Sequence, residues 1–454
     1  MAGSCRVDNE SLMIVRPLSA IVLGFGLSSL TVEQIRAYRW LFVVAIVCVA
    51  VALAQLLPLP AQMIYAMSGH GVVAEIDRAI GNYGALHPIS LTPTLTRNAL
   101  WSMMGPLAVL VLGVQLSLVQ QGRLLPLLIL IGIASTALGV LQILGDPKGV
   151  FYTFQDTDNG LPVGLFANRN HQAVFLATML PMLAVWLRTT EPTPRATQSA
   201  QSFGRPIGVA VLGASLLLII LLTGSRSGVV IALLACFGLP LVIYRPAPRG
   251  SRPSGRFSSL GNLGRVAPIA LVVFTGLIVL AAVWGNRALS LDRLFTNNIG
   301  EDMRIQILPT VQSIIAEYWP MGSGLGSFID VFRMHESADI LMQKSMNNAH
   351  DDWLEALMTA GAPGAAILVF VTVLWLSRVA LLIRTRCSSA PPYMVRLGFI
   401  IFLLYALASF TDYHVQDGSI SCLIVVVAIW MNPAAPVRQG GAAESASSAR
   451  ASVA

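Results

Sequence analysis

The sequence predicts an all-α integral membrane protein with about eleven transmembrane helices and a helical loop domain on the periplasmic side. Three observations lead to this prediction. Hydrophobic residues make up 55% of the 454 residues, charged residues make up only 11%, and the mean hydropathy is +0.71. A soluble domain carries roughly 25% charged residues, so this composition excludes an ordinary soluble enzyme. The apolar residues also form separate stretches, and arginines gather in alternate gaps between them.

The apolar stretches define the expected membrane spans, because a helix needs about 20 apolar residues to cross the hydrocarbon core. They are 12–30, 40–57, 98–119, 123–145, 170–188, 207–223, 227–244, 266–284, 362–384, 394–411 and 418–431. Arg16 and Pro17 interrupt the first stretch. That stretch has an alternative reading as a signal peptide, but no small-residue cleavage site follows Leu30.

Arginine positions predict the orientation, because arginine-rich gaps stay in the cytoplasm. The arginines of the expected cytoplasmic gaps are Arg36, Arg39, Arg123, Arg188, Arg195, Arg205, Arg245, Arg249, Arg252, Arg256, Arg265, Arg378, Arg384, Arg386 and Arg396. The alternate gaps, expected in the periplasm, are 58–97, 146–169, 223–227, 285–361 and 412–417. Eleven spans also put the N-terminus outside, against which Arg6 and Arg16 argue mildly.

Four regions follow from this pattern. We expect an N-terminal transmembrane bundle over 1–284, a large periplasmic loop over 285–361, C-terminal transmembrane helices over 362–431 and a disordered cytoplasmic tail over 432–454. The tail is rich in Ala, Ser and Gly and lacks an apolar pattern. The net charge of +7 comes mostly from arginines in the gaps, which indicates topology and not a nucleic-acid surface.

The first polar cluster stands at the start of the fifth stretch and consists of Asn168, Arg169, Asn170 and His171. One interpretation is an interfacial helix cap, because Asn is a good N-cap and Arg reaches the lipid headgroups. The other is a set of hydrogen-bond donors for a sugar or a phosphate. Both remain open at this point.

A second candidate is Arg226, in the very short turn 223–228 between two apolar stretches. The turn lies on the arginine-poor side, so a role in topology is not indicated. An arginine held at the membrane boundary is costly unless an anion meets it. A phosphate group at the membrane surface is such an anion.

The long loop carries three further features. Residues 303–319 read as an amphipathic helix bearing Arg304, and Gly322, Gly324 and Gly326 follow it. No strand precedes these glycines, so a nucleotide-binding fold is not indicated; a turn that lets the backbone approach a ligand is sufficient.

The third feature is His350, at the start of the next helical stretch, with Asp351 and Glu355 close by. A single histidine is often structural. This one stands among Asn, Asp and Glu residues on the side that holds the other candidates, which favours catalysis.

Two acidic groups are less specific. Asp156 and Asp158 have the form of a DxD metal motif, but no third ligand is evident and such pairs occur by chance. Asp412, His414 and Asp417 cluster in the last outer turn. They either line the same site or form a solvated turn. No metal ion and no cofactor is predicted.

In this order, the polar cluster, the Ser-Arg turn, the arginine helix, the alternating glycines and the Ala-His-Asp segment resemble the O-antigen ligase and O-antigen polymerase family of bacterial membrane proteins. The resemblance runs from about residue 160 to 376. It implies a fold of twelve helices, one more than the sequence indicates, and a multi-pass protein of the inner membrane.

The resemblance also implies an activity: glycosyl transfer, without a metal, from an undecaprenyl-pyrophosphate-linked glycan donor to lipid A-core or to a growing glycan. The family's functional residues correspond to Arg226, Arg304 and His350. The other candidates, expected to bind substrate, are Asn168, Arg169, Asn170, His171, Gly322, Gly324, Gly326 and Asp351. The last outer turn departs from the family pattern, because it lacks an arginine near Gln416.

Two other classes of function fit the composition. A transporter or flippase usually has ionisable residues within its spans and internal repeats. Here no Asp or Glu lies in the centre of an apolar stretch, and no repeat is evident. The second alternative is a non-catalytic partner in polysaccharide assembly.

Overall fold

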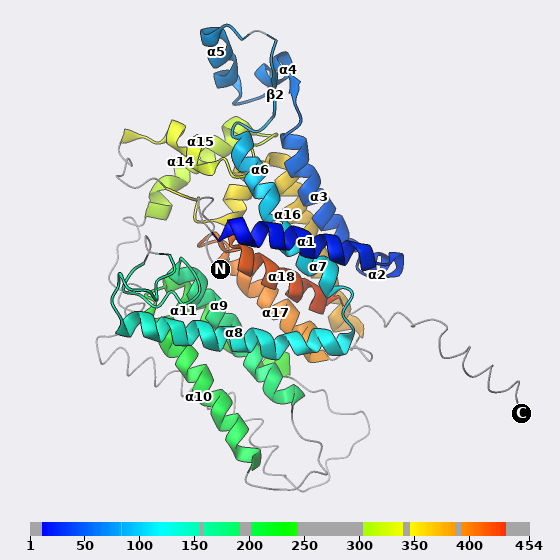
Figure 1. Cartoon of the computed structure of the whole chain (residues 1–454), viewed down its shortest axis with the longest axis vertical. Helices are drawn as coiled ribbons and strands as arrows, with labels where there is room; N and C mark the ends of the chain where they lie inside the picture. Colours follow the sequence, from blue (N-terminus) through cyan, green and yellow to red (C-terminus); the bar gives the residue numbers. More distant parts are fainter. Residues whose placement is uncertain are drawn as a thin grey trace, which may run out of the picture.

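A computed structural model describes residues 11–82, 84–154, 158–190, 201–243, 303–338, 346–385 and 392–432. Figure 1 shows that these residues are almost entirely helical. A single two-stranded sheet is present in the described ranges, in which β1 (Leu59–Pro60) pairs antiparallel with β2 (Leu86–His87). The all-α prediction is confirmed for these ranges.

The helices follow the apolar pattern of the sequence. They are α1 (Leu12–Ser29), α2 (Val32–Ala37), α3 (Arg39–Gln55), α4 (Ala61–Tyr65), α5 (Gly71–Ile80), α6 (Pro93–Ser102), α7 (Met104–Gly113), α8 (Leu118–Leu144), α9 (Arg169–Thr189), α10 (Gln201–Leu222), α11 (Arg226–Ile243), α14 (Met303–Tyr318), α15 (Phe328–His335), α16 (Asp352–Thr385), α17 (Pro392–Ala408) and α18 (Gly418–Met431).

Ten of the expected spans coincide with apolar helices, with most ends shifted by a few residues and the start of α16 at Asp352, ten residues before the expected position 362. Seven helices are long and apolar enough to cross a membrane, and α3, α17 and α18 are shorter apolar helices. The expected span 266–284 lies outside the described residues. The count of about eleven is therefore neither confirmed nor contradicted.

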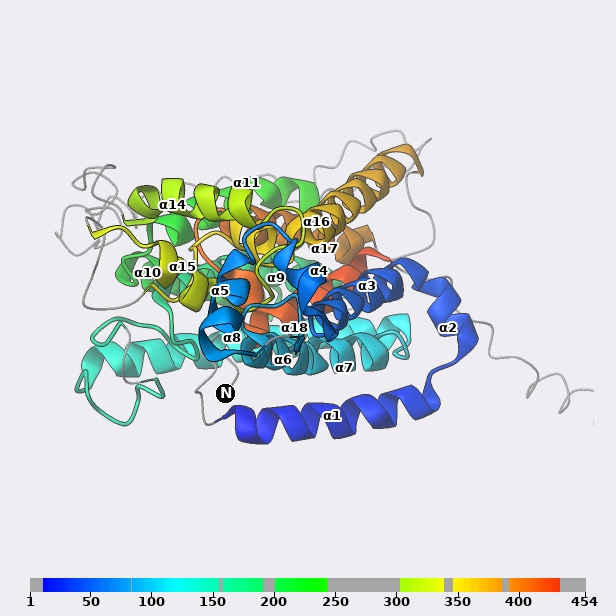
Figure 2. The same cartoon turned by 90° about the horizontal axis from the view of Figure 1, so that it is seen from above.

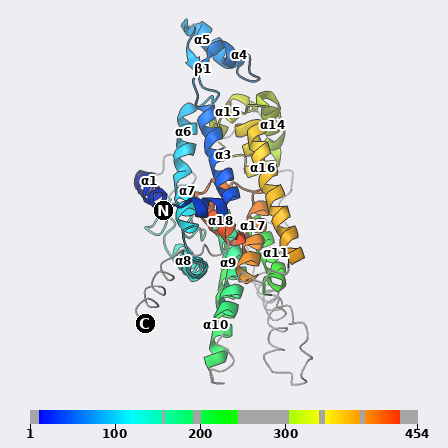
Figure 3. The ribbon, with the colours of Figure 1, turned by 90° about the vertical axis from the view of Figure 1, so that its right-hand side faces the viewer.

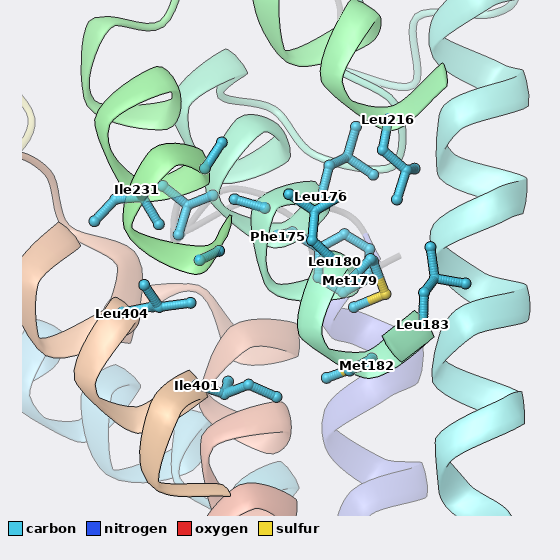
Figure 4. Packing of buried hydrophobic residues seen from close by; sticks show 14 of the residues in the cluster. Phe175, Leu176, Met179, Leu180, Met182, Leu183, Leu216, Ile231, Ile401 and Leu404 are labelled. Atoms are coloured by element: carbon cyan, nitrogen blue, oxygen red, sulfur yellow. The ribbon is translucent and has the colours of Figure 1, made fainter. Parts of the chain in front are cut away.

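The core of the bundle is built around α9, which is the most buried of the candidate spans. Leu176, Met179 and Leu180 of α9 face Leu216 of α10 and Ile231 of α11 in Figure 4. A Cβ atom on Gly228 of α11 would lie 2.3 Å from the Cβ atom of Ala173 in α9. The glycine lets the first turns of the two helices touch, so both helices begin at the same end of the bundle.

The N-terminal helix α1 packs against α7 on the outside of the bundle (Figure 2) and crosses it at an angle in Figure 1. Arg16 donates to the Asn98 side chain at 3.1 Å, and Gln115 donates to the carbonyl of Gly26 at 2.8 Å. The interrupting Arg16 thus has a partner in the fold. The start of α1 lies at the end of the bundle where α6 begins.

Two helical layers stand above this end of the bundle (Figure 3). The nearer layer is α14 and α15, whose buried residues form a core of their own with the start of α16. That core contains Ile307, Val311, Ile314, Tyr318, Phe328, Val331, Phe332, Ala349 and Met358. The outer layer holds α4, α5 and the small sheet, so the expected loop 58–97 is folded over most of its length.

The orientation can be tested with fusions to a reporter that is active only in the periplasm. A fusion after Ser337, in the large loop, is expected to be active. A fusion after Ser254, in an arginine-rich gap, is expected to be silent. The opposite pair of results would place the candidate site in the cytoplasm.

Candidate functional site

The candidate site is centred on Asp412, in the turn between α17 and α18. Its carboxylate is fully buried and gathers groups from three other segments of the chain. His350 Nδ1 lies 2.9 Å from Oδ1, while Asn170 Nδ2 and Asn168 Nδ2 donate to Oδ2 at 2.5 and 3.1 Å. A guanidinium nitrogen of Arg304 lies 3.7 Å from the same Oδ2. Four residues predicted from three separate sequence motifs therefore meet at one carboxylate of the last outer turn.

Asp412 remains an anion in this setting. Burial by itself raises the pKa of a carboxyl group. The hydrogen bond from His350 and the positive charges of His350, His171 and Arg304 act against burial and hold the pKa of Asp412 well below its usual range. The carboxylate therefore stays ionised across the neutral pH range, and stability that depends on it is lost only when the pH falls through this lowered pKa.

The backbone and the ring of His350 are both held in defined positions. Its backbone has a φ of +53°, a conformation that side-chain-bearing residues rarely adopt. Such strain is stored where the surrounding structure demands it, often at functional sites. With Nδ1 donating to Asp412, the lone pair is on Nε2. The side chain is 22% exposed, in contrast to the fully buried Asp412.

Arg226 is the first residue of α11. The turn before it is fixed by local bonds: Ser225 N donates to Thr223 Oγ1 at 3.1 Å, and Gly228 N donates to Ser225 Oγ at 3.0 Å. Because Gly228 packs against Ala173 near the start of α9, Arg226 lies at the end of the bundle that holds Asn168 and Asn170.

Arg169 is paired with Asp158. The Asp158 carboxylate accepts the backbone N–H of Arg169 at 3.1 Å and lies 3.7 Å from its Nε. This contact gives Asp158 a role at the start of α9. Asp156 lies outside the described residues, and the described part of the chain holds no cluster of three or more acidic, His or Cys side chains that could bind a metal ion.

Metal-independent activity stays a prediction. A chelator added to the purified protein is expected to leave its activity unchanged, because an arginine pair can supply the positive charge that a metal would otherwise provide. Loss of activity with the chelator, restored by a divalent cation, would contradict this expectation.

His171 is 1% exposed and lies beneath the surface of the site. Its ring packs against Tyr413 and His414, with centroid distances of 5.1 and 4.9 Å. In this position the His171 ring is enclosed by its neighbours, and substrate binding by His171 stays a prediction. The three ionisable side chains of the turn 412–417 are not solvated, because Asp412, His414 and Asp417 are all fully buried. Of the two interpretations of this turn, the structure favours the one that places it at the site.

Asp351 and Glu355 serve the local fold. Oδ1 of Asp351 accepts the backbone N–H groups of Trp353 and Leu354, which caps the start of α16. Glu355 accepts the backbone N–H of Ala349 at 3.0 Å and so fixes the segment just before His350. Burial raises the pKa of Asp351, and these backbone bonds oppose the rise.

The three glycines lie in a turn packed against other backbone segments. All three have positive φ. A Cβ atom on Gly322 would lie 2.6 Å from the Thr359 carbonyl, and one on Gly324 would lie 2.3 Å from Ser90 Oγ. Gly326 faces the carbonyl of Leu95. The close approach that they allow is therefore to the protein itself; substrate binding by these glycines stays a prediction.

α16 is interrupted where this turn meets it. Gly361 has φ 58° and ψ −139°, which separates a short outer segment carrying the site from the long apolar helix. The Gly361 break and the turn at Gly322 fit together, since Ala362 N donates to the carbonyl of Pro320 at 2.8 Å. The site is thus attached to the membrane helix through a defined joint.

Fold and site together define a multi-pass helical membrane protein with a buried aspartate, a histidine and arginines at one end of its bundle. Residues 210–369 match the protein-family model described as O-Antigen ligase. The chain therefore carries a domain of the O-antigen ligase family, which confirms the resemblance seen in its sequence. The matched segment contains Arg226, Arg304 and His350, but not Asn168 or Asp412. No curated protein matches the chain.

Proposed function

We propose that this protein transfers or polymerises a glycan from an undecaprenyl-pyrophosphate-linked donor at the periplasmic face of the inner membrane. The observation that carries the proposal is His350 bound to Asp412 at 2.9 Å, with Arg304 beside the same carboxylate. The O-antigen ligase family acts on lipid-linked glycans in general, which agrees with a base and cations at one site.

The reaction requires a general base for the acceptor. The acceptor hydroxyl must lose its proton as its oxygen attacks the anomeric carbon of the donor glycan. Nε2 of His350 accepts that proton, and Asp412 orients the ring and stabilises the imidazolium that forms. The acceptor is a sugar hydroxyl of lipid A-core in a ligase, or of a growing glycan in a polymerase.

The second requirement is on the donor side. As the bond from the anomeric carbon to the pyrophosphate oxygen breaks, its electron pair passes to the pyrophosphate. An Arg side chain matches phosphate oxygens through two parallel N–H bonds and stays charged at neutral pH. Arg304 and Arg226 fill this role in our proposal. Pyrophosphate is a good leaving group, so no separate general acid is required.

A transporter has less support. Within the described part of the bundle, the buried acidic and histidine side chains His171, Glu355, Asp412, His414 and Asp417 lie at the ends of helices or in the turn between them. A deletion strain separates the remaining alternatives. Polymer that is made but absent from lipid A-core indicates a ligase, and a single repeat unit left on the core indicates a polymerase.

Asp412→Asn tests the role of the buried carboxylate. The variant is expected to lose activity roughly 10- to 100-fold, as for other carboxylates that orient a functional histidine. Asp330→Asn, on the exposed face of α15, is the matched control and should behave as wild type. Equal activity of the two variants in a transfer assay would remove Asp412 from the account.

A further inference from the structure

A second set of polar groups lies beneath the His350–Asp412 pair, closed off from the surface. Both ring nitrogens of His171, both of His414, and Oδ2 of Asp417 have no hydrogen-bond partner among the described residues. All three side chains are at most 1% exposed. Buried polar atoms are nearly always paired, so five unpaired atoms at one place require an explanation.

The geometry links His171 to Asp417. Nδ1 of His171 lies 3.6 Å from Oδ2 of Asp417. The other oxygen of Asp417 is already used, since Oδ1 accepts the backbone N–H groups of Ser419 and Ile420 at 2.9 and 3.3 Å and caps α18. Oδ2 thus faces the imidazole and serves no helix.

The balance of charge points the same way. Burial disfavours the charged form of His171, whereas the negative charges of Asp412 and Asp417 from the last turn and of Asp352 from α16 favour it. Asp412 is matched by His350 and Arg304, whereas Asp352 accepts bonds from Ser409 Oγ and the Val415 backbone. A buried carboxylate needs a cation close by. Among the ion pairs of the described residues, Asp417 takes part in one, and its partner there is His171.

His414 does not supply this charge. Its ring packs 4.9 Å from that of His171, centroid to centroid. Burial, followed by the charge of His171, lowers the pKa of His414 to about 4. Near neutral pH His414 is therefore uncharged, and Tyr413 and Phe166 complete an aromatic wall around His171.

We propose that His171 is a positioning residue, a buried imidazolium paired with Asp417 that sets the charge beneath His350 without touching substrate. The inference rests on the proposed glycan transfer. A positive charge under Asp412 offsets the negative potential that the buried carboxylates impose on His350. Loss of that charge would favour the protonated form of the base, which cannot accept the proton of the acceptor hydroxyl.

The pH dependence of transfer tests this inference. In His171→Gln the acidic limb of the pH–activity profile is expected to move to higher pH by about one unit, which is roughly a tenfold loss of activity on that limb. In the double variant His171→Gln, Asp417→Asn the limb should return toward wild type, because no buried carboxylate is left unmatched. Asn preserves the cap of α18, so the change at Asp417 removes chiefly a charge.

A neutral control is Tyr405→Phe. Its hydroxyl is another buried unpaired group, and its ring packs against His414. Its removal alters no charge, so the acidic limb should stay in place. A loss of activity at every pH in His171→Gln, with no movement of the limb, would show that His171 serves packing alone and would overturn the proposal.

The melting temperatures of the detergent-solubilised proteins test the same ion pair without a transfer assay. The double variant is expected to melt at a higher temperature than His171→Gln, since breaking one partner of a buried pair is worse than removing both. If the effects of the two substitutions on Tm simply add, His171 and Asp417 do not form an ion pair. If neither His171 variant folds, Asp417→Asn decides: a lower Tm supports the pair, and an unchanged Tm refutes it. If the two changes have non-additive effects on Tm but the wild-type protein shows no transfer activity, the ion pair stands and only the proposed function is refuted.

Discussion

His350→Ala is expected to abolish glycan transfer while the protein remains in the membrane at its normal level. The variant removes the one imidazole that combines a bond to Asp412 with an exposed edge. Loss of a general base lowers a rate by roughly 10²- to 10⁴-fold. The measurement is complementation of a deletion strain, with the surface polysaccharide resolved on a gel and the protein quantified in the membrane fraction.

His335, in the layer formed by α14 and α15, provides the control. His335 of α15 binds the Val331 carbonyl and Glu317 at some distance along the chain from the site. His335→Ala should retain most of the activity. Near-wild-type activity of His350→Ala at matched protein level would mean that another group takes the proton, and Glu355 and Asp351 would then be the next residues to test.

Arg304→Lys and Arg226→Lys are each expected to fold, insert and lose about a hundredfold or more in rate. Lysine keeps the positive charge but offers a point charge, whereas arginine offers a planar fork with five donors. Removing one contact made chiefly in the transition state costs about 2–4 kcal/mol. Transfer from a lipid-linked donor by the purified variants measures the effect.

The matched control for charge is Arg333→Lys, on the exposed side of α15, which should leave the rate unchanged. If both site variants keep more than about half of the wild-type activity, a specific phosphate fork is the wrong explanation. Arg226 would then be an interfacial anchor, as arginines at helix ends often are.

Much of the fold follows from the sequence because lipid imposes simple rules on it. Length and apolar content are enough to locate a spanning helix. Both ends of α9 and α11 lie within a few residues of the expected positions, as does the end of α16, whereas α16 begins earlier than expected. The extension of α16 to Asp352 follows from the cap at Asp351, which an apolar window does not detect.

The centre of the site could not be found in this way. Asp412 is 62 residues from His350 and more than 240 from Asn168, and local patterns carry no information about which distant segments meet. One signal was present: three ionisable residues in the short gap 412–417 between two apolar helices. A gap that short keeps its side chains close to the bundle, which favours burial over solvation.

The glycines illustrate a different limit. Gly322 and Gly324 were expected to let the backbone approach a ligand, whereas the structure shows that they let it approach other parts of the chain, which their spacing does not reveal. The partners are Thr359 and Ser90, which belong to segments on either side of the turn in sequence. Positive φ angles and close packing together fix the contact between the turn at Gly322 and α16, and this contact is visible only in the three-dimensional structure.

The central claim is that this protein catalyses transfer from a polyprenyl-pyrophosphate-linked glycan. The most direct measurement combines the purified protein with such a donor and a glycan or lipid A-core acceptor, with EDTA and without nucleotide sugar, and follows both products. The account predicts a longer acceptor glycan and an equal amount of released polyprenyl pyrophosphate from the wild type, and neither product from His350→Ala. A wild-type protein that folds and binds the donor but forms neither product, or a His350→Ala protein that forms both at the wild-type rate, would contradict it.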